Sequence, residues 1–389
     1  MLGNILLLLF YFTAPAGILF ICRRTKVFNK IGPVLTLYLL GVLVANIGIF
    51  PTEEVEYEKL FKFMESISGA LIPLALPMIL FGCNFKKFSL GKSIGTFIIG
   101  ALSVVVFVFI GYLAFRNNLG EDGAIMGAAL TGQYLGGAAN LGAIKEMLGL
   151  RAENFVLLST CNLIISFFYL MFLMGGGVKL ARLIVGKRKG KEQMVNIEEY
   201  IEENPYKEFG KKKSIIQLGK VLLASVIVMG ISVYIGTKAG GGEGISMVAL
   251  ILSITTLSLL LTCWKEVRSW DKSYDAGMYL IYVFCLIMAT MADLSQIEWG
   301  QSLYILIYQI VIIFGSLFLT IILAKLFRID ADTAVITSDT LINSPLCVPM
   351  IAATMKNKEV IMTGITNGLL GYAVGNYIGF MMFKLFGLF

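Results

Sequence analysis

The sequence predicts an all-α polytopic membrane protein with about 10–13 transmembrane helices, arranged in two inverted repeats that each contain one discontinuous helix. Of the 389 residues, 57% are hydrophobic and only 15% are charged, and the mean hydropathy is +0.83. Soluble domains carry about 25% charged residues. The apolar residues fall into runs long enough to span a bilayer, and glycine, proline and polar residues interrupt two of these runs.

A hydrocarbon core about 30 Å thick requires about 20 apolar residues per helix. Twelve segments meet this requirement, and we expect a helix in each of them: residues 2–22, 31–50, 64–82, 93–115, 123–148, 154–176, 214–236, 245–264, 275–293, 301–327, 332–355 and 359–386. The first segment has no basic region ahead of its apolar run, which favours a transmembrane helix over a signal peptide.

One long polar stretch divides the chain. Residues 179–213 are rich in lysine and glutamate and predict a basic cytoplasmic linker between an N-terminal transmembrane repeat, 1–178, and a C-terminal transmembrane repeat, 214–389. The net charge of +7 comes from this linker and from short loops. It therefore fits the positive-inside bias of membrane proteins, and we expect no nucleic-acid partner.

The two halves resemble each other at a constant spacing. Thr131 and Thr337 are 206 residues apart, and the same spacing separates Gln133 from Asp339. Each half also has the same order of a long helix, an interrupted helix and a helix that carries asparagine or glycine. This shared order predicts an internal repeat.

The charges of the loops predict an orientation but leave one conflict. Basic residues follow the first and third segments, and acidic residues follow the second, which places the amino terminus outside. The linker and the loop after the eighth segment are basic and belong inside, so the halves are antiparallel. Six crossings from an outside start, however, end outside. Either one crossing is miscounted or the charge rule fails at one loop.

The two interrupted segments are the candidate binding site. In hydrocarbon, unwound backbone survives only inside protein or beside a water-filled cavity, and paired Gly/Pro interruptions indicate the binding site of a secondary transporter. The first interruption carries Thr131, Gly132, Gln133, Tyr134, Gly136, Gly137 and Asn140, and the second carries Ser338, Asp339, Thr340, Asn343, Ser344 and Pro345. The alternative is that the glycines are helix-packing positions of the small-xxx-small type.

Asp339 is the single acidic residue near the middle of an apolar segment. An ionisable group there is costly unless it is paired, hydrated or neutralised, so a function is the first hypothesis. Asp339 can bind Na⁺ as a carboxylate or carry a proton, and the absence of histidine leaves carboxylates for any proton coupling. The alternative is a structural carboxylic acid that bonds to Thr337 or Asn343.

The last segment adds two buried amides and a glycine face. Asn367 and Asn376 lie deep in apolar sequence, where they either complete a polar site or bond across helices. Gly371, Gly375 and Gly379 are four residues apart and predict a flat helix face on which another helix packs or slides.

The chain resembles the bacterial membrane-protein family catalogued as domain of unknown function 819. The resemblance rests on TGQYLGGAANLGAI, on the second interruption and on GLLGYAVGNYIG, and it covers both halves outside the linker. The family belongs to a superfamily with sodium/proton antiporters, bile-acid:sodium symporters and glutamate:sodium symporters. The resemblance implies two broken helices crossing near mid-membrane, a core domain, a scaffold domain that often dimerises, and a location in the bacterial inner membrane. One departure is SDTLINSP, which stands where an Asn- and Gly-rich run is expected.

These observations favour a secondary active transporter of a small polar or anionic solute, coupled to Na⁺ or H⁺ and working by alternating access, either elevator or rocking. The expected partners are the solute, membrane lipid and a second copy of the chain, and Na⁺ at Asp339 is the one expected ligand besides the solute. An enzyme is not expected, because histidine, metal-ligand clusters and nucleophile or phosphate-loop motifs are all missing. The alternatives are a channel and a non-transporting membrane scaffold or sensor.

Overall fold

A computed structural model describes the chain except for residues 1, 26–32, 48–53, 83–89, 187–205, 207–208, 242–243, 271, 292–298 and 344. Most of the predicted linker, and the predicted site residue Ser344, therefore lie outside the described residues.

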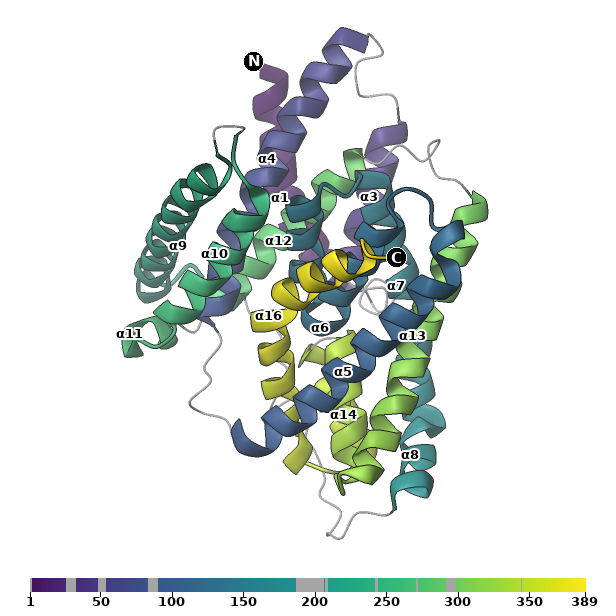
Figure 1. Cartoon of the computed structure of the whole chain (residues 1–389). Helices are drawn as coiled ribbons and strands as arrows, with labels where there is room; N and C mark the ends of the chain where they lie inside the picture. Colours follow the sequence, from purple (N-terminus) through teal and green to yellow (C-terminus); the bar gives the residue numbers. More distant parts are fainter. Residues whose placement is uncertain are drawn as a thin grey trace.

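The described residues are helical and contain no strand (Figure 1). The helices of the first half are α1 (Leu2–Arg24), α3 (Pro33–Asn46), α4 (Glu54–Phe81), α5 (Leu90–Phe115), α6 (Gly123–Leu148), α7 (Ala152–Phe172) and α8 (Val178–Val185). Those of the second half are α9 (Lys212–Ala239), α10 (Met247–Leu261), α11 (Lys265–Arg268), α12 (Ser273–Met291), α13 (Trp299–Leu326), α14 (Ala331–Asn343), α15 (Val348–Met355) and α16 (Glu359–Phe386). A π-helical turn, Leu173–Gly177, joins α7 to α8 without a break in the helix.

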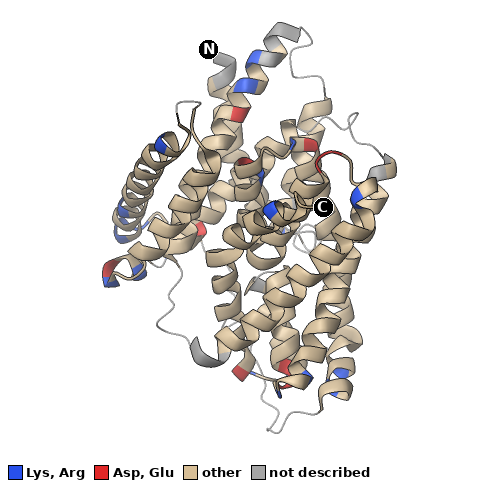
Figure 2. Cartoon of the chain, in the orientation of Figure 1, with Lys and Arg blue, Asp and Glu red and all other residues tan. Residues whose placement is uncertain are grey.

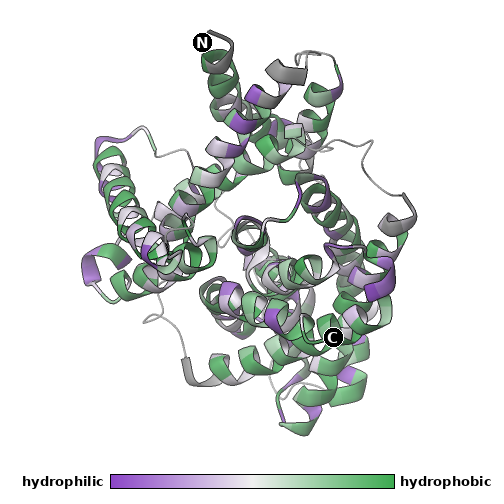
Figure 3. Ribbon diagram, turned by 45° about the horizontal axis from the view of Figure 1, so that its top comes forward, coloured by the Kyte–Doolittle hydropathy of each residue, from purple (hydrophilic) through white to green (hydrophobic). Residues whose placement is uncertain are grey.

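The protein is a polytopic membrane protein, as the sequence predicts. Within the described ranges, eight helices are long and apolar enough to cross a membrane, and α3 and α10 supply two shorter apolar helices, Thr36–Asn46 and Met247–Leu261. Hydrophobic residues also cover the outer faces of the helices (Figure 3). Leu223 is 62% exposed and Phe168 is 61% exposed. An apolar surface of this extent is unfavourable in water and is suited to lipid.

The first interrupted helix turns back on itself. Inside α6 the backbone leaves helical geometry at Gly136 (φ −137°, ψ 23°) and Gly137 (φ 65°, ψ −163°). The residues on either side of this turn pack against each other, because a Cβ on Gly132 would meet the carbonyl oxygen of Asn140 and the side chain of Ile144. We call 123–148 hairpin 1. Only glycine adopts the positive φ of residue 137 at low cost, which explains why the reversal occurs there.

The second interruption is also a hairpin. Helix α14 ends at Asn343, a single 3₁₀ turn covers Pro345–Cys347, and α15 returns to the end at which α14 began. The return is fixed by hydrogen bonds, since Asn357, just beyond α15, donates to Asp332 in the first turn of α14 at 2.9 Å. We call 331–355 hairpin 2.

The hairpins open at opposite ends of the molecule. Asp122, just before hairpin 1, accepts hydrogen bonds from Arg151 and Asn154 at the start of α7. Arg182, near the end of α8, bonds to Asp332 at the start of hairpin 2. Because α7 and α8 form one membrane-spanning helix, residues 152–185, its two ends mark the two mouths.

The expectation of two broken helices that cross near mid-membrane is therefore wrong, because both segments enter the protein and leave by the same side. With the shorter helices α3 and α10 counted as crossings, each half has five crossings and one hairpin, and an outside start leads to an inside linker. On this count the conflict between the loop charges and the number of crossings disappears, and the orientation itself stays a prediction. The inverted arrangement of the two repeats stays a prediction.

Lys and Arg residues lie at both ends of the helices, as do Asp and Glu residues (Figure 2), and several basic residues mark the end where hairpin 2 opens. Arg23 and Arg24 end α1, Lys211 precedes α9, and Lys325 lies in the last turn of α13. We call this end the basic end, and the positive-inside rule predicts that it faces the cytoplasm.

The helices pack in two groups that each draw on both halves of the sequence. Helices α1, α3, α4, α9, α10 and α12 form a scaffold group, in which Gly41 and Gly277 let α12 lie close to α3 and α4. Helices α5, α7, α8, α13 and α16 surround the two hairpins and form a hairpin group. The segment boundaries at 178 and 213 stay a prediction about the sequence repeat, because neither group coincides with one half.

The hairpin topology predicts a labelling pattern for single cysteines in a background from which the six native cysteines are removed. Glu121→Cys and Glu153→Cys flank hairpin 1, so both should react with an impermeant maleimide added to intact cells. Asp330→Cys and Lys358→Cys flank hairpin 2, so both should react only after lysis. If the two segments crossed the membrane, only one member of each pair would be labelled from outside.

Candidate functional site: two hairpin tips on a glycine face

The tips of both hairpins meet on one face of α16. A Cβ on Gly371 would overlap the carbonyl oxygen of Leu135, at the tip of hairpin 1. A Cβ on Gly368 would overlap the ring of Pro345, at the tip of hairpin 2. The absence of side chains at these positions therefore lets two chain reversals lie against one helix, where their backbone is covered by protein.

The same face continues along hairpin 1. Cβ atoms on Gly375 and Gly379 would overlap the side chains of Asn140 and Ile144. The packing interpretation of these glycines is therefore correct, and it applies to Gly132 as well. It does not compete with the binding-site interpretation, because close packing on α16 is what holds the tips in place.

Asn140 joins hairpin 1 to α16. Its Nδ2 donates to the carbonyl oxygens of Gly371 and Tyr372 at 3.2 and 3.4 Å. These two acceptors fix the orientation of the amide, since only the nitrogen can donate. Its Oδ1 is buried and accepts no hydrogen bond.

The other polar residues of hairpin 1 have separate roles. Thr131 donates to the carbonyl oxygen of Gly127 at 2.9 Å and so bonds within its own helix. The Tyr134 hydroxyl donates to Gln309 Oε1 at 2.9 Å, and Gln309 Nε2 donates to the Leu158 carbonyl at 3.2 Å. Gln133 is 4% exposed, and its Oε1 has no hydrogen-bond partner.

Asp339 is fully buried in α14, four residues before the tip of hairpin 2. Its Oδ1 accepts a hydrogen bond from Asn343 Nδ2 at 2.8 Å, and its Oδ2 accepts none. Thr337 bonds elsewhere, so of the two neighbours considered for a structural role only Asn343 is a partner. Among the described residues no cation lies in an ion pair with Asp339.

The remaining predicted residues of hairpin 2 attach it to three helices. Ser338 shares a hydrogen bond with the Tyr169 hydroxyl of α7 at 2.9 Å, and Thr340 donates to the Gly364 carbonyl of α16 at 3.0 Å. Asn367 Nδ2 donates to Thr337 at 2.8 Å and to Thr96 of α5 at 3.1 Å. The cross-helix interpretation of Asn367 is thus correct for its nitrogen.

Asn376 lies apart from the hairpin tips. Its Nδ2 donates to Thr255 of α10 at 3.2 Å, so it joins the hairpin group to the scaffold group. Tyr372, closer to the tips, forms a second such link through a hydrogen bond of 3.2 Å between its hydroxyl and that of Tyr274 in α12.

The hairpins and α16 contain several buried acceptor oxygens without partners. Among the described residues, the buried amide and carboxylate atoms that lack a hydrogen bond are all oxygens, and all of them belong to the hairpins or to α16. They are side-chain oxygens of Gln133, Asn140, Asp339, Asn343, Asn367 and Asn376. The remaining buried side-chain atoms of the described residues without a hydrogen bond are serine hydroxyls. Unsatisfied buried oxygens require an explanation, and oxygen is the ligand that hard cations prefer.

Sequence reasoning missed three residues that position this site. Gln309 and Tyr169 are polar groups within long apolar runs, and that contrast is a signal that a search of the sequence could have used. Arg182 carries no such signal, because it lies in the basic approach to the linker. Only the fold brings it to Asp332.

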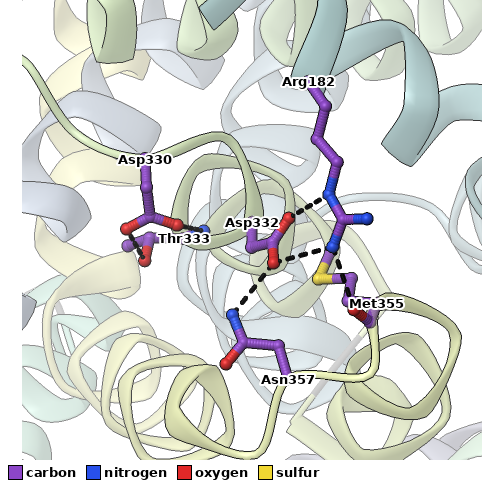
Figure 4. Close-up of polar contacts among 6 residues, drawn as sticks. All are labelled: Arg182, Asp330, Asp332, Thr333, Met355 and Asn357. Carbon is purple, nitrogen blue, oxygen red and sulfur yellow. Dashed lines mark hydrogen bonds and ion pairs between the residues drawn. The ribbon is translucent and has the colours of Figure 1, made fainter. Parts of the chain in front are cut away.

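Polar clamps close both hairpin mouths. At hairpin 2, Arg182 bonds to both carboxylate oxygens of Asp332, at 2.7 and 2.9 Å, and to the Met355 carbonyl at 2.9 Å (Figure 4). Asp330 caps α14 by accepting from the Thr333 backbone at 2.9 Å. At hairpin 1, the hydrogen bond to Asp122 raises the pKa of the Arg151 guanidinium. Each clamp ties the start of a hairpin to groups beyond its end.

Comparisons with known proteins match nearly the whole chain. A family model described as "Protein of unknown function (DUF819)" matches residues 9–388. An "Uncharacterized membrane protein YjcL" of Bacillus subtilis (strain 168) is 22% identical over 366 residues, which cover 88% of this chain and 87% of that protein.

The clamp at hairpin 2 predicts a large loss of stability for Arg182→Gln. The Asp332 side chain is fully buried, and removal of its charged partner leaves a buried carboxylate unpaired. We expect the free energy of unfolding in detergent to fall by about 3 kcal/mol. The control is Lys220→Gln, which breaks an exposed pair with Glu266 and should cost about 1 kcal/mol or less. Equal losses in both variants would contradict a clamp.

The glycine face predicts that Gly371→Ala is poorly tolerated. The new Cβ meets backbone of the hairpin 1 tip, which cannot rotate away, and we expect a loss of about 1–3 kcal/mol in unfolding free energy. The control is Gly95→Ala in α5, where nothing lies within 4 Å of the new Cβ. That variant should be neutral or slightly stabilised, because alanine favours the helix. Thermal unfolding of the Gly371→Ala and Gly95→Ala variants, each compared with the wild type, measures the two effects.

Proposed function

The chain belongs to the family described as "Protein of unknown function (DUF819)", and we propose from the geometry of the site that it is a secondary active transporter of a small polar or anionic solute, coupled to Na⁺ or H⁺. The observation that carries the proposal is the meeting of two hairpin tips on α16, beside buried oxygens that lack partners. Irregular backbone at membrane depth is a recurring feature of transporter binding sites.

Asp339 supports ion coupling. A buried carboxylate with one amide donor and no cationic partner is unfavourable in its charged form. A bound proton removes that charge, and a bound Na⁺ compensates it, so the folded protein gains stability from either ion. Asn343 Oδ1, also without a partner, is one turn away in the same helix and is the second oxygen that we assign to this ion.

The hairpin tips support a solute with polar groups. The second arm of each hairpin begins at the tip, so its first backbone N–H groups point toward the meeting point and favour an anionic group. The oxygens of Gln133 and Asn140 are acceptors and favour hydrogen-bond donors. We therefore assign Asp339 and Asn343 to the coupling ion, and Gln133, Asn140 and the backbone of both tips to the solute.

The arrangement of the two helix groups supports alternating access. Tyr274, which contacts Tyr372, is the second residue of α12 and lies at the basic end of the scaffold group. Tyr372 in turn borders hairpin 1, since its hydroxyl oxygen would lie 3.6 Å from a Cβ on Gly137. The tips thus lie level with one edge of the scaffold. We propose that this is the state open to the cytoplasm, and that the hairpin group moves against the scaffold to reach the other side.

The decisive experiment is thermal unfolding of the purified protein in Na⁺, K⁺ and choline salts across pH, beside Asp339→Asn. A ligand that binds only the folded state stabilises it by about 2.7 kcal/mol at a hundredfold excess over Kd. Sodium coupling predicts a Na⁺-specific rise in Tm that Asp339→Asn abolishes. Proton coupling predicts a rise in Tm as the pH falls, again lost in the variant. The matched control is Asp330→Asn, the same substitution at the exposed cap of the same hairpin, which should keep the wild-type response.

A transport assay completes the test. Uptake of candidate solutes into proteoliposomes should require the ion gradient and should be lost in Asp339→Asn and in Asn140→Ala. If both variants bind and transport as the wild type does, the proposal is wrong. Conductance in planar bilayers far above a transporter's turnover would identify a channel instead, and the absence of ion response, uptake and conductance would favour a membrane scaffold or sensor.

A further inference from the structure

An elongated cavity lies within the scaffold group, at the basic end and away from the hairpins. It has a volume of about 650 Å³ and lies between α1, α4, α9 and α12. Along α1 its wall runs from Phe12 to Arg23, a span of about 16 Å at 1.5 Å per residue. Apart from Arg23, the residues of α1 that line it are apolar. The cavity therefore has an apolar body with positive charge at one end.

Two arginines at the basic end form no ion pair with the residues that the structure describes. The guanidinium of Arg23 lies 5.9 Å from the ring centroid of Tyr206, and that of Arg24 lies 4.4 Å from the ring centroid of Phe20. Both rings line the cavity. Among the described residues, no carboxylate forms an ion pair with either arginine. Two exposed cations over aromatic rings at a membrane surface leave their N–H groups available to an anion.

The end of the linker covers the same place. Tyr206 donates a hydrogen bond to the Asp275 carbonyl of α12 at 3.3 Å, and its ring stacks edgewise on Phe209. Both rings form part of the cavity wall. Burial raises the pKa of the Tyr206 hydroxyl above its ordinary value, so this group stays neutral and adds no negative charge beside the arginines.

We propose that this cavity binds one anionic phospholipid of the membrane, with an acyl chain between α1, α9 and α12 and its phosphate on Arg23 and Arg24. The shape of the cavity and the position of its charge match a lipid, whose apolar chain runs parallel to the helices and whose headgroup lies at the cytoplasmic surface. Basic pockets between transmembrane helices on that side recognise anionic headgroups.

The lipid would join the linker to the scaffold. Its chain would contact Tyr206 and Phe209 on one side and α9 on the other, and would strengthen the attachment of the linker end to the scaffold. The proposal concerns the scaffold group alone and does not depend on the transport proposal.

The test is binding of phosphatidylglycerol, measured by native mass spectrometry and thermal unfolding of the delipidated full-length protein in detergent. Phosphatidylcholine with the same acyl chains is the neutral comparison, and glycerol 3-phosphate tests the headgroup chemistry without a chain. We expect one tightly bound phosphatidylglycerol and a rise in Tm that phosphatidylcholine does not match. Glycerol 3-phosphate should have no effect.

Three variants locate the site. The double variant Arg23→Gln, Arg24→Gln should weaken phosphatidylglycerol binding by about thirtyfold, since each basic residue near an anionic lipid contributes a factor of about five. Ala16→Phe, which fills the cavity from an exposed position on α1, should block the chains of both lipids. Arg268→Gln removes a basic residue of the same end outside the cavity and should bind as the wild type does.

Several outcomes would overturn the proposal. Equal binding of the two lipids would show that the arginines do not distinguish an anionic headgroup from a neutral one. Unchanged binding in the double variant or in Ala16→Phe would place the lipid elsewhere. If the wild type binds no phosphatidylglycerol, the proposal is wrong.

Discussion

The structure depends on one constraint, which is that a chain reversal inside a membrane must be covered by protein. Backbone groups at the tip of a hairpin cannot bond within a helix, and hydrocarbon offers them no partner. Here the cover is α16, whose glycines at 368, 371, 375 and 379 let both tips approach its backbone. Asn140 then bonds to carbonyl groups of that same helix, so packing and hydrogen bonding act at one place. The candidate site can form because the tips of both hairpins lie close to the backbone of α16.

The hairpins are held at their mouths by α7 and α8, as well as at their tips by α16. One continuous helix, α7 with α8, contacts hairpin 1 through Arg151 and Asn154 at one end, and hairpin 2 through Arg182 at the other. This helix therefore fixes the depth of both tips relative to each other. Between the hairpin group and the scaffold group, α16 forms neutral hydrogen bonds: Asn376 with Thr255, Tyr377 with Thr256 and the Leu252 carbonyl, and Tyr372 with Tyr274. The contact of α8 with hairpin 2 is an ion pair, and this difference favours motion between the groups over motion within the hairpin group.

The sequence predicted the membrane class, the two interruptions and the residues around them, because glycine, proline and buried amides stand out in apolar runs. It could not distinguish a hairpin from a crossing, since both need a similar number of apolar residues. Counting each interrupted segment as a hairpin also removes the conflict between the loop charges and the number of crossings. Contacts such as Tyr134 with Gln309 and Arg182 with Asp332 could not be predicted, because they join residues far apart in sequence whose register only the fold sets.

The spacing of 206 residues joins matching positions in the two hairpins. Gln133 and Asp339 lie at this spacing, each in the first arm of its hairpin shortly before the tip, and each is buried with an oxygen that has no partner. Thr131 and Thr337 share the spacing and the same bond to the carbonyl four residues earlier. The local structure of the two arms is thus alike, while their charge differs. An ion whose binding requires a carboxylate would therefore bind at hairpin 2 alone, which leaves the neutral arm of hairpin 1 to contact the solute.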